Sequence, residues 1–378
     1  MNNTIKLAVA SALLAAASSA SAAGGIVAGD WTLDIGGNVN AFVTQTSTKG
    51  SASPDVNNIT TGLLPNFLSV GGKTRQNDLD VAFTISLQPG AATDGTLQLG
   101  TINQRQAFLT FGDASWGSFK LGKDLGIYAS DAILSDMTLL GVGAGAASVG
   151  NTTLGRIGYG YQYADWKSQV AYSSPNFNGF SFTAGVTQAW NATGPTTPVT
   201  LRGGEEPAFE GKAAYAFAGD VSGKVWVSGI SQNVQLTSST SKTASAWDVG
   251  ANVSAAGFGL TAYYGEGKGT GSLGQFSSGF DDSGDKRDNE DWYVQGTYNL
   301  PGVGTKLGVS YGESTNKGTD ADAYAAAKST NEMWTVGAYH PITKHLNLVA
   351  EYSNAKNVVT GSATTEKDTV SLGAILFF

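Results

Sequence analysis

The chain has 378 residues, no cysteine, 2 histidines and a formal net charge of −8. The lack of cysteine excludes disulfide frameworks, thiolate metal sites and cysteine nucleophiles, and two histidines leave little room for a His-based centre. Only 14% of residues are charged and 51 are glycine, which is unlike a soluble enzyme, and the acidic balance argues against a nucleic-acid partner.

The first 22 residues have the order of a secretory signal. Lys6 supplies a positive charge, an apolar run follows from Leu7 to Ala17, and Ala20-Ser21-Ala22 places small residues at a cleavage site. The apolar run is too short to span a bilayer. We expect residues 1–22 to be removed on export and residues 23–378 to form the mature domain. The alternative interpretation is a buried helix of a soluble protein.

After residue 30 the chain alternates with a period of two. Between Asp291 and Leu300, for example, Trp292, Val294 and Tyr298 share one face while polar residues occupy the other. Such alternation predicts strands with one apolar and one polar face. The breaks between these runs predict sixteen strands, at residues 31–46, 66–75, 79–88, 104–112, 117–123, 158–174, 180–190, 209–218, 224–236, 244–255, 258–268, 290–300, 305–316, 330–340, 345–357 and 367–378.

The connections alternate between short and long. Short breaks such as 112–117, 176–179 and 301–304 carry Gly, Asn or Pro, whereas long polar segments include 47–65, 191–208 and 270–289. An even number of strands with tight turns at one end and long loops at the other indicates an all-β, antiparallel transmembrane β-barrel. Sixteen strands leave a lumen too wide for side chains to fill, which predicts an aqueous channel.

Aromatic residues gather near the ends of the predicted strands, on the outward face. Amphipathic rings favour the boundary between membrane and water. The residues concerned are Trp31, Tyr172, Phe180, Tyr215, Phe258, Tyr264, Trp292, Tyr298, Tyr311, Trp334, Tyr352 and Phe378. The competing interpretation is the core of a soluble β protein.

Several stretches resemble the general porins of Gram-negative bacteria. They are Arg105–Phe108 followed by Gly117–Lys123, the run from Gln169 to Phe182 around a Ser-Pro turn, and an alternating last strand that ends in Phe378. The resemblance implies a homotrimer of sixteen-stranded barrels in the outer membrane, exported through the periplasm, that passes ions and small hydrophilic solutes by diffusion. It also implies that Phe378 is an assembly signal for insertion.

The resemblance further implies that the third long loop folds into the barrel and narrows the pore. We predict this loop at Asp124–Ile157, the longest connection in the chain, and its apolar residues suit packing on the barrel wall. A short helix is expected within Ala129–Leu140. The sequence departs from the family at Lys123, where an arginine is usual, and the loop holds few acids.

Selectivity depends on the width of a pore and on the field across its narrowest point. Loop carboxylates that face wall cations would provide that field, so the predicted constriction comprises Asp124, Asp131, Asp136, Arg105, Lys120, Lys123 and Arg156. By strand parity, the lumen also receives Lys73, Arg75, Lys167, Lys212, Lys224, Lys306, Asp34, Asp80, Glu210, Asp248 and Glu351. With Lys120, the inner face receives seven basic and five acidic residues, a balance too even to give the sign of ion selectivity. Solvated charges without a selective role are the plainer interpretation of most of them.

One charge cluster lies in the loop predicted at 270–289. It runs from Asp281 to Asp291, and it fails as a calcium loop because Trp292 occupies the position that requires glutamate. We expect it to be solvated at the outer surface, where divalent cations could bridge it to lipopolysaccharide.

The leading hypothesis is a passive porin without cofactor, metal or catalytic residues. The alternative is a substrate-selective channel in which lumen-facing Trp226, Tyr263, Tyr293 and Tyr339 bind a solute. A hydrolase is disfavoured because His340 and His345 flank a tight turn. We expect the trimer contact at the first and last strands, where Ile35, Gly37, Val39, Ala41 and Ala374 face outward.

Overall fold

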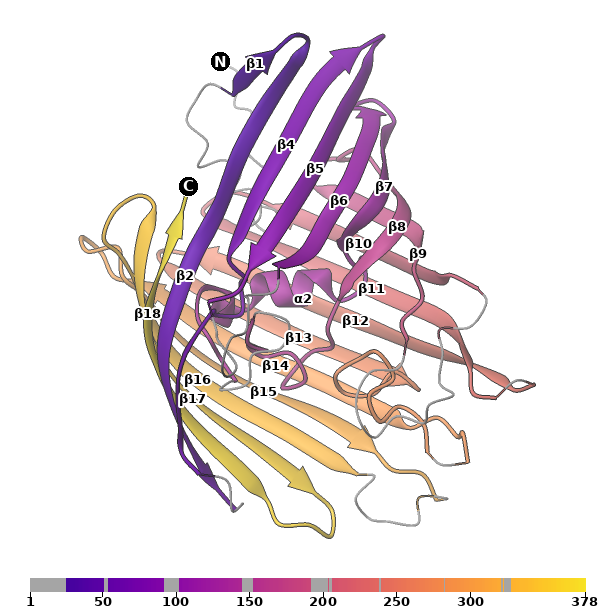
Figure 1. Ribbon diagram of the computed structural model, residues 1–378, viewed down its shortest axis with the longest axis vertical. Helices are drawn as coiled ribbons and strands as arrows, with labels where there is room; N and C mark the ends of the chain where they lie inside the picture. Colours follow the sequence, from indigo (N-terminus) through magenta and orange to yellow (C-terminus); the bar gives the residue numbers. More distant parts are fainter. Residues whose placement is uncertain are drawn as a thin grey trace.

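The computed structural model describes residues 25–50, 54–91, 102–144, 152–191, 203, 206–237, 239–281, 283–320, 322 and 328–378. In this part of the chain, sixteen antiparallel strands form a closed barrel, shown in Figure 1. They are β2 (Trp31–Lys49), β4 (Phe67–Gln76), β5 (Leu79–Pro89), β6 (Ile102–Asp113), β7 (Gly117–Leu125), β8 (Trp166–Ser173), β9 (Phe180–Thr187), β10 (Ala208–Phe217), β11 (Val221–Gln235), β12 (Ser241–Ala255), β13 (Phe258–Lys268), β14 (Asp288–Asn299), β15 (Lys306–Lys317), β16 (Ser329–Pro341), β17 (Leu346–Val359) and β18 (Thr365–Phe377). The predicted signal segment lies outside the described residues.

Each strand pairs with the next one in the chain, and the barrel closes where β18 pairs with β2. Phe377 lies opposite Asn38, and the backbones of Phe378 and Gly37 exchange hydrogen bonds of 3.0 and 3.1 Å. Closure satisfies backbone groups that would otherwise face hydrocarbon, where no hydrogen-bond partner is available. Among the described residues, no helix combines the length and apolar character needed to cross a membrane.

Two short strands were not predicted. The strands β1 (Ile26–Ala28) and β3 (Val56–Thr60) each pair with β2 and lie beside the barrel strands. Segment 47–65 was expected to be loop throughout, and β3 corrects that expectation. Both strands are too short to show a clear periodicity in sequence.

The alternation of exposed and buried residues confirms the predicted two faces of the wall. On β12, Trp247 and Val249 are 44% and 43% exposed on the outside, whereas Asp248 between them is fully buried on the inside. The outward aromatic residues contact one another along the wall, as in Trp292 with Tyr311 and Trp334 with Tyr352. These rings form the kind of belt that marks a membrane boundary.

Candidate functional site

The loop between β7 and β8 enters the barrel. This loop, residues 126–165, is called L3 below, and its helix α2 (Ser130–Ser135) lies inside the ring of strands in Figure 1. The predicted bounds were wrong at both ends: Asp124 belongs to β7, and the strand predicted at 158–174 begins at Trp166. Gly158 and Gly160 have positive φ values of 74° and 146°, which break the strand, although the tyrosines at 159, 161 and 163 imitate its alternation.

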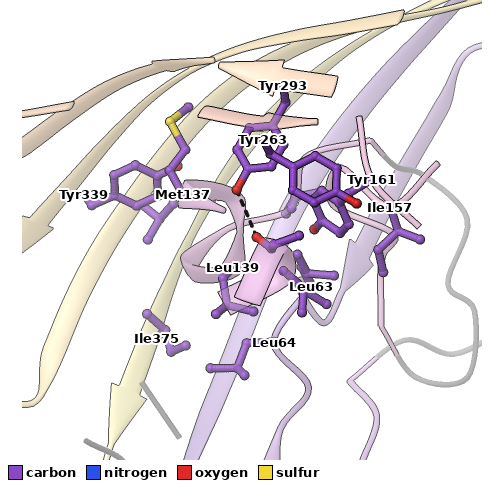
Figure 2. Close-up of a cluster of buried hydrophobic side chains, with 14 of the residues drawn as sticks. Leu63, Leu64, Met137, Leu139, Ile157, Tyr161, Tyr263, Tyr293, Tyr339 and Ile375 are labelled. Carbon is purple, nitrogen blue, oxygen red and sulfur yellow. Dashed lines mark hydrogen bonds between the residues drawn. The ribbon is translucent and has the colours of Figure 1, made fainter. Parts of the chain in front are cut away.

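The apolar side of L3 packs on the inner wall. The expected helix is present as α2 and the 3-10 helix Met137–Leu140, and Figure 2 shows this segment among tyrosines of the wall and leucines of the 61–66 segment. The Tyr293 hydroxyl donates to the Ala132 carbonyl at 3.0 Å. The proposed aromatic track is covered by the loop, because Trp226, Tyr263, Tyr293 and Tyr339 are at most 4% exposed.

Glu210 of β10 anchors the start of L3. One carboxylate oxygen accepts the backbone N–H groups of Ile127 and Tyr128, both at 2.8 Å. The other accepts Lys167 at 2.5 Å and the Thr187 hydroxyl at 2.7 Å. The side chains of Lys167 and Glu210 are 2% and 0% exposed, so this ion pair is enclosed between loop and wall.

Two further wall residues anchor the middle of L3. Glu351 of β17 accepts the N–H groups of Val142 at 2.7 Å and Gly143 at 2.9 Å, while Gln295 of β14 accepts that of Met137 at 2.7 Å. Glu351 also accepts the Tyr339 hydroxyl at 2.6 Å. Lys167 and Glu351 point inward, but both side chains bind groups beneath the loop and are not free lumenal charges.

Asp136 and Arg156 lie within the folded loop. Asp136 begins the 3-10 helix, accepts the Thr138 N–H at 3.0 Å, and accepts the Tyr161 hydroxyl at 2.9 Å. The fully buried Arg156 donates to the Met333 carbonyl at 2.8 Å and to the Ser310 hydroxyl. Burial lowers the pKa of its guanidinium. These contacts give both residues a role in holding the shape of L3.

A cavity of about 1280 Å³ lies in the lumen between L3 and the wall formed by β2 and β4–β11. Its charged lining comprises Lys73, Lys120, Lys212, Lys224, Asp34, Asp124 and Asp131. Asp131 of α2 is bound by Lys224 and, at 3.2 Å, by Lys212, and Lys120 binds Asp124. Burial would raise the pKa of Asp131, but the two ammonium groups outweigh it and hold that pKa below its ordinary value.

The other predicted site residues lie elsewhere. Lys123 is on the outward side of β7, where its ammonium donates to the Gln104 carbonyl at 2.9 Å. Arg105 is buried with its guanidinium 5.8 Å from the Trp166 ring. Arg75 and Asp80 form a 2.8 Å ion pair at the short-turn rim. Lys123 shares the outward parity of Phe119 on β7, and Arg105 lies opposite the β-bulge between Ser86 and Leu87. Arg75 shares strand parity with Lys73, which lines the lumenal cavity, but it lies at the end of β4 and outside that cavity.

The loop between β13 and β14 also folds inward, which the sequence interpretation missed. This loop, residues 269–287, is called L6. Phe276 and Phe280 are 1% and 5% exposed and cover inward-facing residues of β11 and β12. Ring contacts of 6.2–6.4 Å run from Phe280 through Phe276 and Trp190 to Tyr128 of L3. The Tyr163 N–H of L3 also donates to the Leu273 carbonyl of L6 at 3.0 Å, so L6 packs against L3 as well as the wall.

Polar contacts hold L6 in this position. Arg287 binds both carboxylate oxygens of Asp322 at 2.5 and 3.0 Å, and this contact lowers the pKa of Asp322. Asp281 accepts two backbone N–H groups and the Thr319 hydroxyl. The expectation of a fully solvated acidic cluster is wrong, since Asp281 and Asp291 are 3% and 1% exposed and Asp291 belongs to β14.

The fold and the inward loop define an outer-membrane β-barrel channel. A family model described as Gram-negative porin matches residues 8–360. The chain belongs to the Gram-negative porin family, and it is an outer-membrane channel for passive diffusion of small solutes. No curated protein matches the chain.

Solved structures share this fold at low sequence identity. The outer-membrane channel DcaP of Acinetobacter baumannii is 18% identical with a TM-score of 0.71, covering 94% of this chain and 100% of that one. The anion-selective porin from Comamonas acidovorans is 16% identical with a TM-score of 0.66, covering 92% and 100%. Salmonella typhi OmpF is 17% identical with a TM-score of 0.56, covering 92% and 99%.

Proposed function

We propose that the channel is constricted between α2 and the lysines of β10 and β11, and that it weakly prefers anions. The observation that supports this most strongly is the pairing of one carboxylate, Asp131, with two lysines, Lys212 and Lys224. Lys73, exposed in the same cavity, adds a further positive charge. The similar Comamonas porin is described as anion-selective, in agreement with this proposal.

A substrate-selective channel is the weaker candidate. Its aromatic residues would have to reach a solute, yet Trp226, Tyr263, Tyr293 and Tyr339 are covered by L3. A separate observation argues against catalysis. The His340 ring is hydrogen-bonded to the Thr305 hydroxyl at 2.8 Å near a tight turn, and it does not line the cavity. We therefore propose passive transport without enzymatic activity, cofactor or metal chemistry.

The proposed assembly follows from the family and from the outward surface. A homotrimer is supported by a similar outer-membrane protein, OmpT of Vibrio cholerae, whose structure is described in a trimer form. The outward side chains of β2 and β18 near closure remain our proposed contact, with Ile35 and Val39 49% and 56% exposed. Lipid and lipopolysaccharide would surround the remaining wall. Residues 1–22 are proposed to be the export signal and Phe378 the assembly signal.

Charge substitutions at the constriction should change ion selectivity in opposite directions. Asp131→Asn leaves two unpaired lysines and should raise the anion-to-cation permeability ratio, whereas Lys212→Gln should lower it. We expect severalfold changes, because unit charges about 4 Å apart interact by about 1 kcal/mol even in water. The measurement is the reversal potential in a planar bilayer under a salt gradient.

The matched control is Lys317→Gln, which removes a lysine of β15 whose side chain is 53% exposed. Equal reversal potentials in all four proteins would contradict the proposed constriction.

A further inference from the structure

The barrel wall is interrupted on one side of β2. This strand pairs with β4 as far as Asn38 and with β3 from Phe42 onward, so among the described residues no strand lies opposite 39–41 on that side. Between β3 and β4 the chain leaves the wall as a buried segment, residues 61–66, which is called the strap below. Backbone groups beside such a gap need other hydrogen-bond partners, because hydrocarbon offers none.

Asparagine side chains supply partners at this gap. Asn40 of β2, which is 3% exposed, accepts the Gly62 N–H at 2.9 Å and donates to the Leu64 carbonyl at 2.9 Å. The same amide donates to the Asn38 side chain at 2.9 Å, and the Asn40 backbone N–H donates to the Asn66 side chain at 2.6 Å. Asn40 therefore binds the strap near its beginning, in its middle and at its end.

The strap in turn binds L3. The Leu63 N–H donates to the Gly141 carbonyl at 2.9 Å, and the Thr153 N–H donates to the Gly62 carbonyl at 3.2 Å. The Thr152 hydroxyl donates to the Leu63 carbonyl at 2.7 Å. The two leucines of the strap also belong to the apolar cluster that contains the 3-10 helix of L3 (Figure 2). Hydrogen bonds and apolar contacts thus join the strap to the second half of the loop.

L3 lies between the strap and the opposite wall without spare room. A Cβ built on Gly62 would overlap the Gly141 carbonyl oxygen, and a Cβ built on Gly141 would overlap the Glu351 carboxylate of β17. Glu351 holds the wall side of this arrangement through the N–H groups of Val142 and Gly143. The strap holds the other side, so its release would leave L3 supported from the wall alone at this point.

We propose that Asn40 is a positioning residue of the channel, because it fixes the strap that keeps L3 where it narrows the pore. The inference rests on the proposed constriction by L3. Asn40 is not among the described residues that line the lumenal cavity, so it acts on permeating ions through the strap and L3. An asparagine suits this role because its amide accepts and donates hydrogen bonds at once and carries no charge.

The first test is single-channel recording of Asn40→Ala in planar bilayers. The substitution removes three side-chain hydrogen bonds, and losing three bonds of ordinary strength should raise the released fraction of the strap at least about tenfold. L3 should then move, and the open channel should spend at least about tenfold more time in altered conductance levels than wild type. The matched control is Asn354→Ala, which removes two hydrogen bonds of 2.7 and 2.8 Å on β17 and should record like wild type.

Release of the strap can be measured separately by thiol labelling. Leu64→Cys places the only thiol of the chain in the strap, at a position that is 6% exposed. A water-soluble maleimide should label this cysteine at least about tenfold faster when Asn40→Ala is added, and no faster when Asn354→Ala is added. A loss of barrel stability that left the strap docked would change neither the labelling rate nor the recordings.

A second variant covers failure of Asn40→Ala to fold. In Gly62→Ala the new methyl group meets the Gly141 carbonyl and separates the strap from L3, so the fluctuations should appear although Asn40 is intact. Adding Asn40→Ala should increase them little, because both substitutions release the same contact. The control is Gly296→Ala on β14, where a Cβ meets nothing within 4 Å.

Three results would overturn the proposal. They are wild-type recordings from Asn40→Ala, wild-type recordings from Gly62→Ala, and faster labelling of the strap without any change in the recordings. The last result would mean that the strap is released without moving L3. Failure of the proposed constriction would be seen separately, as an unchanged reversal potential in Asp131→Asn.

Discussion

Replacing Glu210 with alanine is expected to lower the free energy of unfolding by about 3–5 kcal/mol, because the substitution leaves the buried charge of Lys167 without its partner. It also removes the acceptor of the Ile127 and Tyr128 N–H groups, so L3 should loosen where it leaves β7. Urea unfolding followed by the mobility shift between folded and unfolded barrel on gels measures the loss.

The matched control is Glu332→Ala. Glu332 pairs with Lys356 at 2.9 Å in a partly exposed position, where ion pairs contribute about 1 kcal/mol or less. Adding Lys167→Met to Glu210→Ala should recover part of the stability, since the double variant no longer buries an unpaired ammonium group. A loss for Glu210→Ala no larger than for Glu332→Ala would show that the anchor does not stabilise the barrel.

Replacing Phe276 with alanine should release L6 from the lumen. Truncating a buried phenylalanine costs about 3–5 kcal/mol, and a loop can undock locally at that cost while the barrel stays folded. Cleavage by trypsin at Lys286 or Arg287 should accelerate at least about 100-fold, because each 1.4 kcal/mol changes the open population about tenfold. Single-channel conductance should rise, since L6 occupies part of the outer lumen.

Phe209→Ala is the control for that experiment. Phe209 is 61% exposed on the outward side of β10, so the same truncation should leave trypsin cleavage and conductance unchanged. Unchanged cleavage in Phe276→Ala would mean that the aromatic contacts with Trp190 and Phe280 are not what holds L6 inside the barrel.

Strand parity predicted most of the fold, because a wall with one apolar and one polar face requires apolar and polar residues to alternate in every membrane-spanning strand. Lys212 and Lys224, which parity assigns to the inner face, line the lumenal cavity, and Glu351 is buried beneath L3. Parity failed at 158–165, where alternating tyrosines belong to L3 and glycines with positive φ break the strand. It also could not place Arg105, which lies at a β-bulge where the alternation slips.

The paths of the loops could not be obtained from local patterns. Whether Glu351 is a free lumenal charge or an anchor depends on N–H groups more than 200 residues away, in L3. The inward fold of L6 did leave a signal, since Leu273, Phe276 and Phe280 are apolar residues in an otherwise polar loop. That was the same kind of signal that correctly indicated an inward L3.

The most direct test of a passive, water-filled channel is the single-channel conductance of wild type in planar bilayers over a wide range of salt concentration. A constricted but open lumen predicts discrete conductance steps whose size increases in proportion to salt concentration without saturation. Under a salt gradient, the reversal potential should have the sign expected for anion selectivity. Folded protein that inserts without conducting, or a conductance that saturates at low salt, would contradict free diffusion and favour a closed or solute-binding lumen.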